Sequence, residues 1–213
     1  KIMESVRKGK GLTPEWEEEM VAAGVPDWYI GSCKKIKYMF PKAHAAAYVM
    51  SAIRVAWYKV HMPVAFYCAM FTVSSVGLDA EIVMRGQRGV SAEIERIEKL
   101  GKEASQKEQA SVAGLQLVRE AYARGIKFLP INLKKSDQKA FLPENNAIRL
   151  PFSSLSGLGE NAALNIIEAR NEEDFFSVED LQIRAKLSGS VIEILRKNGV
   201  LDGLSDTDQI SFF

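Results

Sequence analysis

A stretch of 51 residues, from Trp28 to Leu78, contains no aspartate or glutamate. The same stretch holds six lysines or arginines and both histidines, and all 27 acidic residues lie elsewhere in the chain. A surface that lacks carboxylates but carries cations attracts polyanions, because each carboxylate would repel a phosphate and each cation can neutralise one. The alternative is a buried apolar helix that excludes charge of either sign. That alternative accounts for residues 45–50 but not for the lysines that precede them.

The composition is that of a water-soluble globular protein, with 213 residues and a net charge of +1. This length allows one ample core or two small domains. Cys33 and Cys68 fit neither a disulfide framework nor a metal-binding CxxC pair, which favours a reducing compartment. The chain opens with Lys rather than Met and shows no signal peptide, so we expect a piece of a longer protein. The uncharged run 61–78 is interrupted by Pro63 and by hydroxyl residues, which predicts a core helix rather than a membrane span.

The pattern of apolar residues predicts a mainly α fold. Thr13-Pro14 predicts a helix start, with Thr as the N-cap and Pro at the first helical position. Further predicted helices cover residues 42–60, 63–73, 91–107 and 111–124. Two short strands, 126–130 and 147–150, are predicted with Asn145-Asn146 as a turn able to adopt positive φ. We therefore expect a helical region over 1–128, a short β connection over 129–150, a second helical domain over 151–204 and a tail over 205–213.

The predicted helix from Lys42 places a polar stripe opposite an apolar one. His44, Tyr48 and Arg54 fall on the polar stripe, and Lys42 and His44 lie in the first turn. Free backbone N–H groups and the positive end of the helix dipole attract phosphate there. The sequence therefore predicts an anion site at this end. The alternative is that His44 and Tyr48 are satisfied polar groups of an interior.

The segment Lys37-Tyr38-Met39-Phe40-Pro41-Lys42-Ala43-His44-Ala45-Ala46-Ala47-Tyr48 resembles part of the fingers of C-family bacterial replicative polymerases, and is most similar to the PolC type of DNA polymerase III alpha subunit. The likeness extends upstream through 6–17 and downstream through 58–63, and covers essentially the whole chain. It implies that residues 1–128 are a fingers region, in which Lys42, His44 and Tyr48 contact the incoming dNTP. It also implies that Lys35, Lys37 and Arg54 contact the template or primer backbone.

Residues 155–163 fit a helix-hairpin-helix turn. Gly157 and Gly159 permit a tight connection next to Ser156, and the following helix can present its N–H groups to duplex phosphates. By itself the pattern also fits any corner between two helices. The resemblance implies that 151–204 is a duplex-binding module, with a second, degenerate turn at Ser188-Gly189.

The chain ends in Gln209, Ile210, Ser211, Phe212 and Phe213. An extended peptide with alternating apolar anchors can fill a pocket on another protein. The alternative is a terminus that folds back onto its own domain. The segment is similar to the sliding-clamp motif of PolC chains, with Ile for Leu and Phe for the penultimate Leu, so we expect it to bind the clamp.

Polymerase chemistry needs carboxylates that converge on two Mg²⁺ ions, but the sequence has no Asp-x-Asp cluster, and Asp27 and Asp79 stand isolated. The resemblance implies that the Mg²⁺ ligands lie in a palm outside this chain, which would be inactive alone. It further implies primer-template DNA, palm, thumb, exonuclease and other replisome subunits as partners, in the bacterial cytoplasm at the nucleoid and away from membranes. The rival hypothesis is a non-enzymatic helix-hairpin-helix module of a repair or recombination factor. A protein-interaction bundle without DNA is a third.

Overall fold

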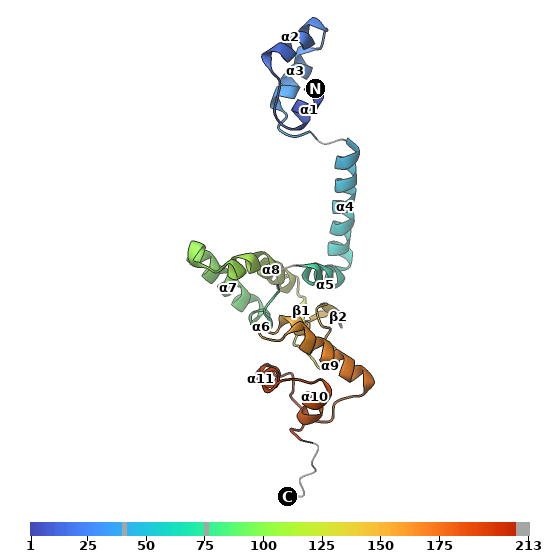
Figure 1. The fold of residues 1–213 in the computed structure, drawn as a ribbon, viewed down its shortest axis with the longest axis vertical. Helices are drawn as coiled ribbons and strands as arrows, with labels where there is room; N and C mark the ends of the chain where they lie inside the picture. The colour runs from blue at the N-terminus through green and yellow to red at the C-terminus, as the bar shows by residue number, and fades with distance from the viewer. Residues whose placement is uncertain (40–41, 75–76, 208–213) are drawn as a thin grey trace, which may run out of the picture. The chain divides into compact units, whose positions relative to one another are not determined.

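The computed structural model describes residues 1–39, 42–74 and 77–207. The chain divides into two compact units, Lys1–Ala56 and Trp57–Phe213. Most of the described secondary structure is helical, and a single small sheet lies in the second unit, so the predicted mainly α fold is confirmed. The elements are drawn in Figure 1.

The first unit begins with three short helices, α1 Ile2–Arg7, α2 Pro14–Ala22 and α3 Asp27–Lys35. The Thr13 side chain accepts a hydrogen bond from the Trp16 amide at 3.4 Å, which confirms the predicted helix start. The buried side chains of Val6, Met20 and Ile30 make a small core.

Helix α4 runs from Lys42 to His61, close to the predicted range. None of its residues, all of which the structure describes, is buried. The prediction of a helix is therefore right, and the alternative of a buried apolar helix is not what the structure shows for this segment.

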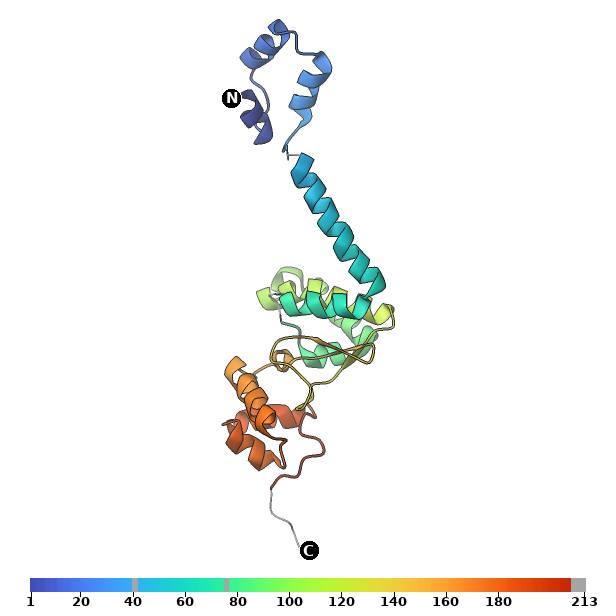
Figure 2. The same cartoon turned by 90° about the vertical axis from the view of Figure 1, so that its right-hand side faces the viewer.

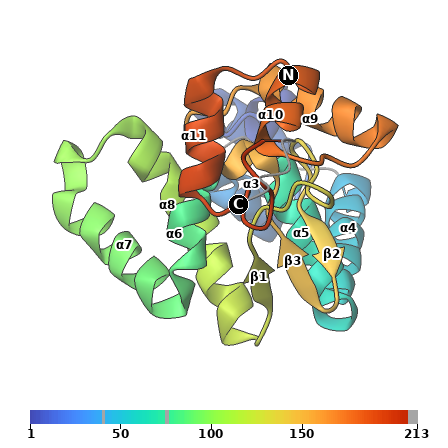
Figure 3. The same ribbon diagram turned by 90° about the horizontal axis from the view of Figure 1, so that it is seen from below.

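The second unit begins with the last turn of α4 and continues with α5 Pro63–Val73, α6 Ala80–Met84, α7 Gly86–Leu100, the 3-10 turn η1 Gly101–Glu103 and α8 Gln106–Ala123. Helices α7 and α8 pack side by side (Figure 3). The predicted helix over 91–107 is wrong at both ends. Gly101, with a φ of 53°, ends α7, and Ser105 forms a capping box with Glu108 that begins α8.

Three strands, β1 Lys127–Leu129, β2 Leu142–Glu144 and β3 Ala147–Arg149, form a sheet in the order β1-β3-β2. Strand β3 is parallel to β1 and antiparallel to β2. Asn145 and Asn146 have φ values of 49° and 60°, which confirms the predicted turn. Arg149 is only 8% exposed, and its guanidinium pairs with the Glu144 carboxylate at 2.7 Å and donates to the Pro130 carbonyl at 2.6 Å.

A compact group of helices follows: η2 Phe152–Ser154, α9 Glu160–Glu172, α10 Val178–Arg184 and α11 Gly189–Lys197 (Figure 2). Ile166, Leu181 and Leu195 are fully buried among them and belong to the core cluster of the second unit. The link between α9 and α10 is fixed by Arg184, which donates to the carbonyls of Ala169 and Glu173.

Candidate nucleic-acid interface

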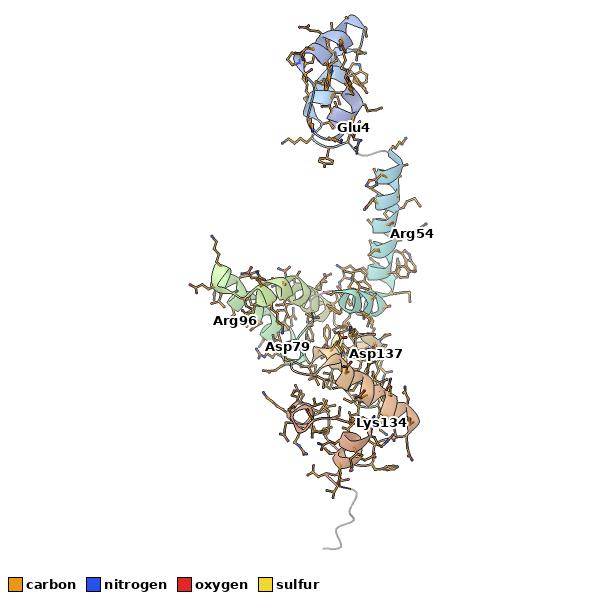
Figure 4. The ribbon with its side chains drawn as sticks, viewed as in Figure 1. Glu4, Arg54, Asp79, Arg96, Lys134 and Asp137 are labelled. Carbon is orange, nitrogen blue, oxygen red and sulfur yellow. The ribbon has the colours of Figure 1, made fainter. Side chains whose placement is uncertain are left out.

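The exposed side chains of α4 are the first part of the candidate interface. Tyr48 is 67% exposed, and its ring lies 4.4 Å from the His44 ring, so the helix brings these two predicted residues together. Arg54 projects from the same helix (Figure 4). Lys42 is also exposed, but it lies two residues from His44 and therefore points about 200° around the helix. Lys42 thus flanks the start of the helix rather than joining the His44 and Tyr48 stripe.

The segment before α4 is fixed by a close backbone contact. A Cβ on Gly9, whose φ is +72°, would lie 1.8 Å from the Lys37 carbonyl oxygen. The Met39 amide donates to the Arg7 carbonyl at 3.4 Å. These contacts join two of the segments that carry the family resemblance, and they leave the side chains of Lys35 and Lys37 exposed.

Two of the six cations in the carboxylate-free stretch are held in ion pairs. Lys34 lies 2.6 Å from Glu17, and Lys59 lies 2.8 Å from Glu120. The Lys59 pair belongs to a cluster in which Arg124 also contacts Glu120, at 3.2 Å. The hydrogen bond from Lys59 lowers the pKa of Glu120, and burial raises the pKa of the neighbouring Tyr67 hydroxyl to about 12. The interpretation of the whole stretch as one free cationic surface is therefore too broad, because Lys59 fastens the end of α4 to α8.

The first hairpin turn lies between η2 and α9. Gly157 has a φ of +89°, which favours glycine at the turn, and a Cβ at this position would lie 3.0 Å from the end of the Ile194 side chain of α11, a tight contact. Helix α9 begins after Gly159 without a side-chain cap. Its first N–H groups are thus available to a ligand at an exposed helix start.

The side chain of Ser156 is held by a hydrogen bond within the protein. Its hydroxyl donates to Asp79 Oδ2 at 2.8 Å, while Asp79 Oδ1 accepts from the Glu81 and Ile82 amides as the N-cap of α6. Asp79 therefore has a structural role, as the N-cap of α6 and as the partner of Ser156. An Asp placed directly before Ala-Glu-Ile could have been recognised as an N-cap, but its second contact joins residues 77 positions apart and leaves no local signal.

The acid at the start of α9 is balanced by a residue that the sequence did not single out. Glu160 lies 2.8 Å from Lys139, in the loop before β2.

The second turn differs from the first. The Ser188 hydroxyl caps α11 by accepting from the Val191 amide at 3.4 Å and lies 2.8 Å from the Ser190 hydroxyl, so Ser188 already serves the helix, beside Gly189.

The five residues of the expected clamp-binding motif lie outside the described residues. The structure does describe Ser205 and Asp206, which precede this motif. Ser205 forms a parallel bridge with Ser177, and the Val178 amide donates to the Ser205 carbonyl at 2.9 Å. Asp206 pairs with Arg196 at 2.9 Å.

Across the described ranges, no three His, Cys, Asp or Glu side chains gather in a group able to hold a metal ion. That the Mg²⁺ ligands lie elsewhere stays a prediction. Among these same residues no helix is both long and apolar enough to cross a membrane.

Short helices joined by glycine turns, with an uncapped helix start at one turn, define a helix-hairpin-helix module. A family model described as a helix-hairpin-helix motif matches residues 125–209. Over its whole length the chain is also similar to DNA polymerase III PolC-type proteins. It is 50% identical to those of Halalkalibacterium halodurans and Bacillus subtilis over 213 residues, and 47% identical to that of Thermotoga maritima over 214. The recognition of the chain as a segment of the PolC-type family is thereby confirmed. The chain spans about 15% of the length of these relatives.

Proposed function

We propose that this chain is the nucleotide- and DNA-contacting part of a replicative DNA-directed DNA polymerase. The observation that carries the proposal is the exposed, carboxylate-free surface of α4 in a chain that matches PolC-type polymerases from end to end. The full enzyme transfers nucleotides with Mg²⁺ held by carboxylates outside this chain. It works in the cytoplasm at the nucleoid, together with its palm, thumb and exonuclease regions and other replisome subunits.

In this proposal His44 and Tyr48 form one contact with the incoming dNTP. The imidazole donates to a phosphate oxygen, and the phenol ring next to it packs against the sugar or base. Lys42 contributes a point charge from the other side of the helix start, where the backbone N–H groups also favour phosphate. Lys35, Lys37 and Arg54 contact the template or primer backbone, because exposed cations can neutralise phosphates.

The helix-hairpin-helix module holds the duplex behind the site. The N–H groups at Gly159 and the start of α9 bind phosphate without reading bases. Ser156 orients the turn through Asp79 in this scheme. The turn at Ser188-Gly189 contributes less, because Ser188 already caps α11. The residues from Gln209 to Phe213 attach the enzyme to its sliding clamp.

The test of the nucleotide site uses steady-state kinetics of the full-length polymerase that contains this segment. Lys42→Ala and His44→Ala should each raise the apparent KM for dNTP about tenfold, which corresponds to one charge-assisted hydrogen bond of about 1.4 kcal/mol. Lys10→Ala is the matched control, because Lys10 is an exposed lysine outside α4. Unchanged KM values in both α4 variants would exclude the proposed contacts.

A further inference from the structure

The loop before β2 is fixed to η2, the element that precedes the first hairpin turn. The backbone carbonyls of Asp137 and Gln138 accept hydrogen bonds from the first two amides of η2, each at 2.9 Å. The Asp137 carboxylate accepts from the amides of Lys139 and Ala140 at 2.9 and 2.8 Å, which sets the direction of the chain at Lys139. The backbone that carries the Lys139 side chain is therefore held in place.

The same loop reaches the start of α9. The Gln138 side chain donates to the Glu160 carbonyl at 3.4 Å, and the Lys139 ammonium lies 2.8 Å from the Glu160 carboxylate. Both side chains of this ion pair are largely exposed, Lys139 at 55% and Glu160 at 67%. A pair between two exposed side chains contributes little to stability, because water and salt screen it. The Lys139 ammonium can therefore exchange the carboxylate for another anion with little loss of stability.

The position of the pair connects it to the proposed duplex contact. Glu160 is the first residue of α9 and directly follows Gly159, in the turn whose N–H groups we propose to bind phosphate. A carboxylate at this point repels an approaching phosphate, whereas the ammonium beside it attracts one. The approach of DNA therefore favours separation of the two side chains.

We propose that Lys139 is a further duplex contact, and that a phosphate of the duplex takes the place of Glu160 as its partner. The inference rests on the proposed duplex-binding role of the first hairpin turn. It adds a cation from outside the hairpin and makes Glu160 a competitor of DNA for that cation. Because the loop is already fixed by hydrogen bonds, less conformational entropy is lost when Lys139 binds a phosphate.

The experiment measures the affinity of the full-length polymerase for a fluorescent primer-template duplex by anisotropy at several salt concentrations. Lys139→Ala should weaken binding about fivefold, as expected for loss of one charge-assisted contact. It should also reduce the slope of log affinity against log salt concentration by about 0.9, because one counterion fewer is released. Lys139→Arg keeps the charge and should retain most of the affinity. Glu160→Gln should strengthen binding roughly threefold, because it removes the competing carboxylate.

Glu168→Gln is the matched control for Glu160→Gln. Glu168 is an exposed acid roughly two turns, or about 12 Å, further along α9, so that its substitution removes the same charge at a distance where salt screens it. This control should leave the affinity nearly unchanged. An unchanged affinity and salt slope in Lys139→Ala, or no more strengthening by Glu160→Gln than by Glu168→Gln, would overturn the inference.

Hydrogen exchange of the unmodified polymerase with and without the duplex tests the underlying proposal separately. The proposal predicts added protection of the amides at 158–162, where the turn passes into α9. No added protection in this range would exclude the hairpin turn as a duplex contact. Protection there, together with an unchanged affinity of Lys139→Ala, would overturn the role of Lys139 alone.

Discussion

Among the partly exposed side chains of the helix-hairpin-helix module, removal of Arg184 should lower the free energy of unfolding the most. Its guanidinium donates to the Glu173 carbonyl at 2.9 Å and to the Asp174 carbonyl at 3.3 Å, in addition to Ala169. It also lies 4.9 Å from the centre of the Phe175 ring. The carbonyls of Glu173 and Asp174 follow the last turn of α9 and have no helical partners, whereas the Ala169 carbonyl also accepts from the Glu173 amide at 3.3 Å.

Arg184→Met keeps much of the packing of the stem but removes all of these contacts. Counting about 1 kcal/mol for each of the three partly solvated carbonyls and about 0.5 kcal/mol for the ring contact gives a loss of about 3.5 kcal/mol. For a chain of this size that loss corresponds to a fall in the melting temperature of about 8 °C. Thermal unfolding followed by far-ultraviolet circular dichroism measures it.

Arg184→Lys tests whether the stabilisation by Arg184 comes from the planar geometry of its guanidinium or from its charge. A single ammonium group cannot reach several carbonyls in the planar arrangement that a guanidinium offers, so this variant should recover less than half of the loss. Arg119→Ala, at an exposed site of α8, should shift the melting temperature by no more than about 1 °C. A fall of less than about 2 °C for Arg184→Met would refute the argument.

Two further predictions concern contacts between distant parts of the second unit. Ser156→Ala and Asp79→Ala should lower duplex affinity by similar factors, and the double variant should be no weaker than either, because the hydroxyl acts through the carboxylate. If Ser156 instead touches phosphate, fluorescence anisotropy would show that Asp79→Ala binds the duplex more tightly than the unmodified chain. For Glu120, the hydrogen bond from Lys59 lowers the pKa, so its carboxylate stabilises the fold above the unfolded pKa of about 4.3 and this contribution disappears as pH falls through the lower folded value. Melting temperatures between pH 5 and 3 should therefore fall less in Glu120→Gln than in the unmodified chain, and parallel curves would contradict this.

Local patterns predicted most of the helices. The range of α4 could be read from its apolar period, and that of α5 from Pro63 at its start, because these signals lie within the helix itself. The error over 91–107 arose because the apolar spacing of Ile94, Ile97 and Leu100 ends at residue 100, whereas the predicted helix was continued past Gly101. Ser105 and Glu108 together are a recognisable capping box that marks the start of the next helix.

The site was less predictable from sequence. Helical geometry shows that Lys42 and His44 point to different sides, although they are neighbours in sequence and were grouped together. The partners of Lys59 and Ser156 lie 61 and 77 positions away in the chain. Such contacts depend on how the elements pack, so no local pattern reports that Lys59 is paired or that Asp79 orients the hairpin.

The most direct test of the account is photo-crosslinking of a photoreactive dNTP analogue to the full-length polymerase in a complex with primer-template. The account predicts that mass spectrometry finds the crosslink in the peptides that span residues 42–54, and that unlabelled dNTP competes it away. Crosslinks that fall wholly outside this segment would contradict the claim that the carboxylate-free face of α4 receives the incoming nucleotide.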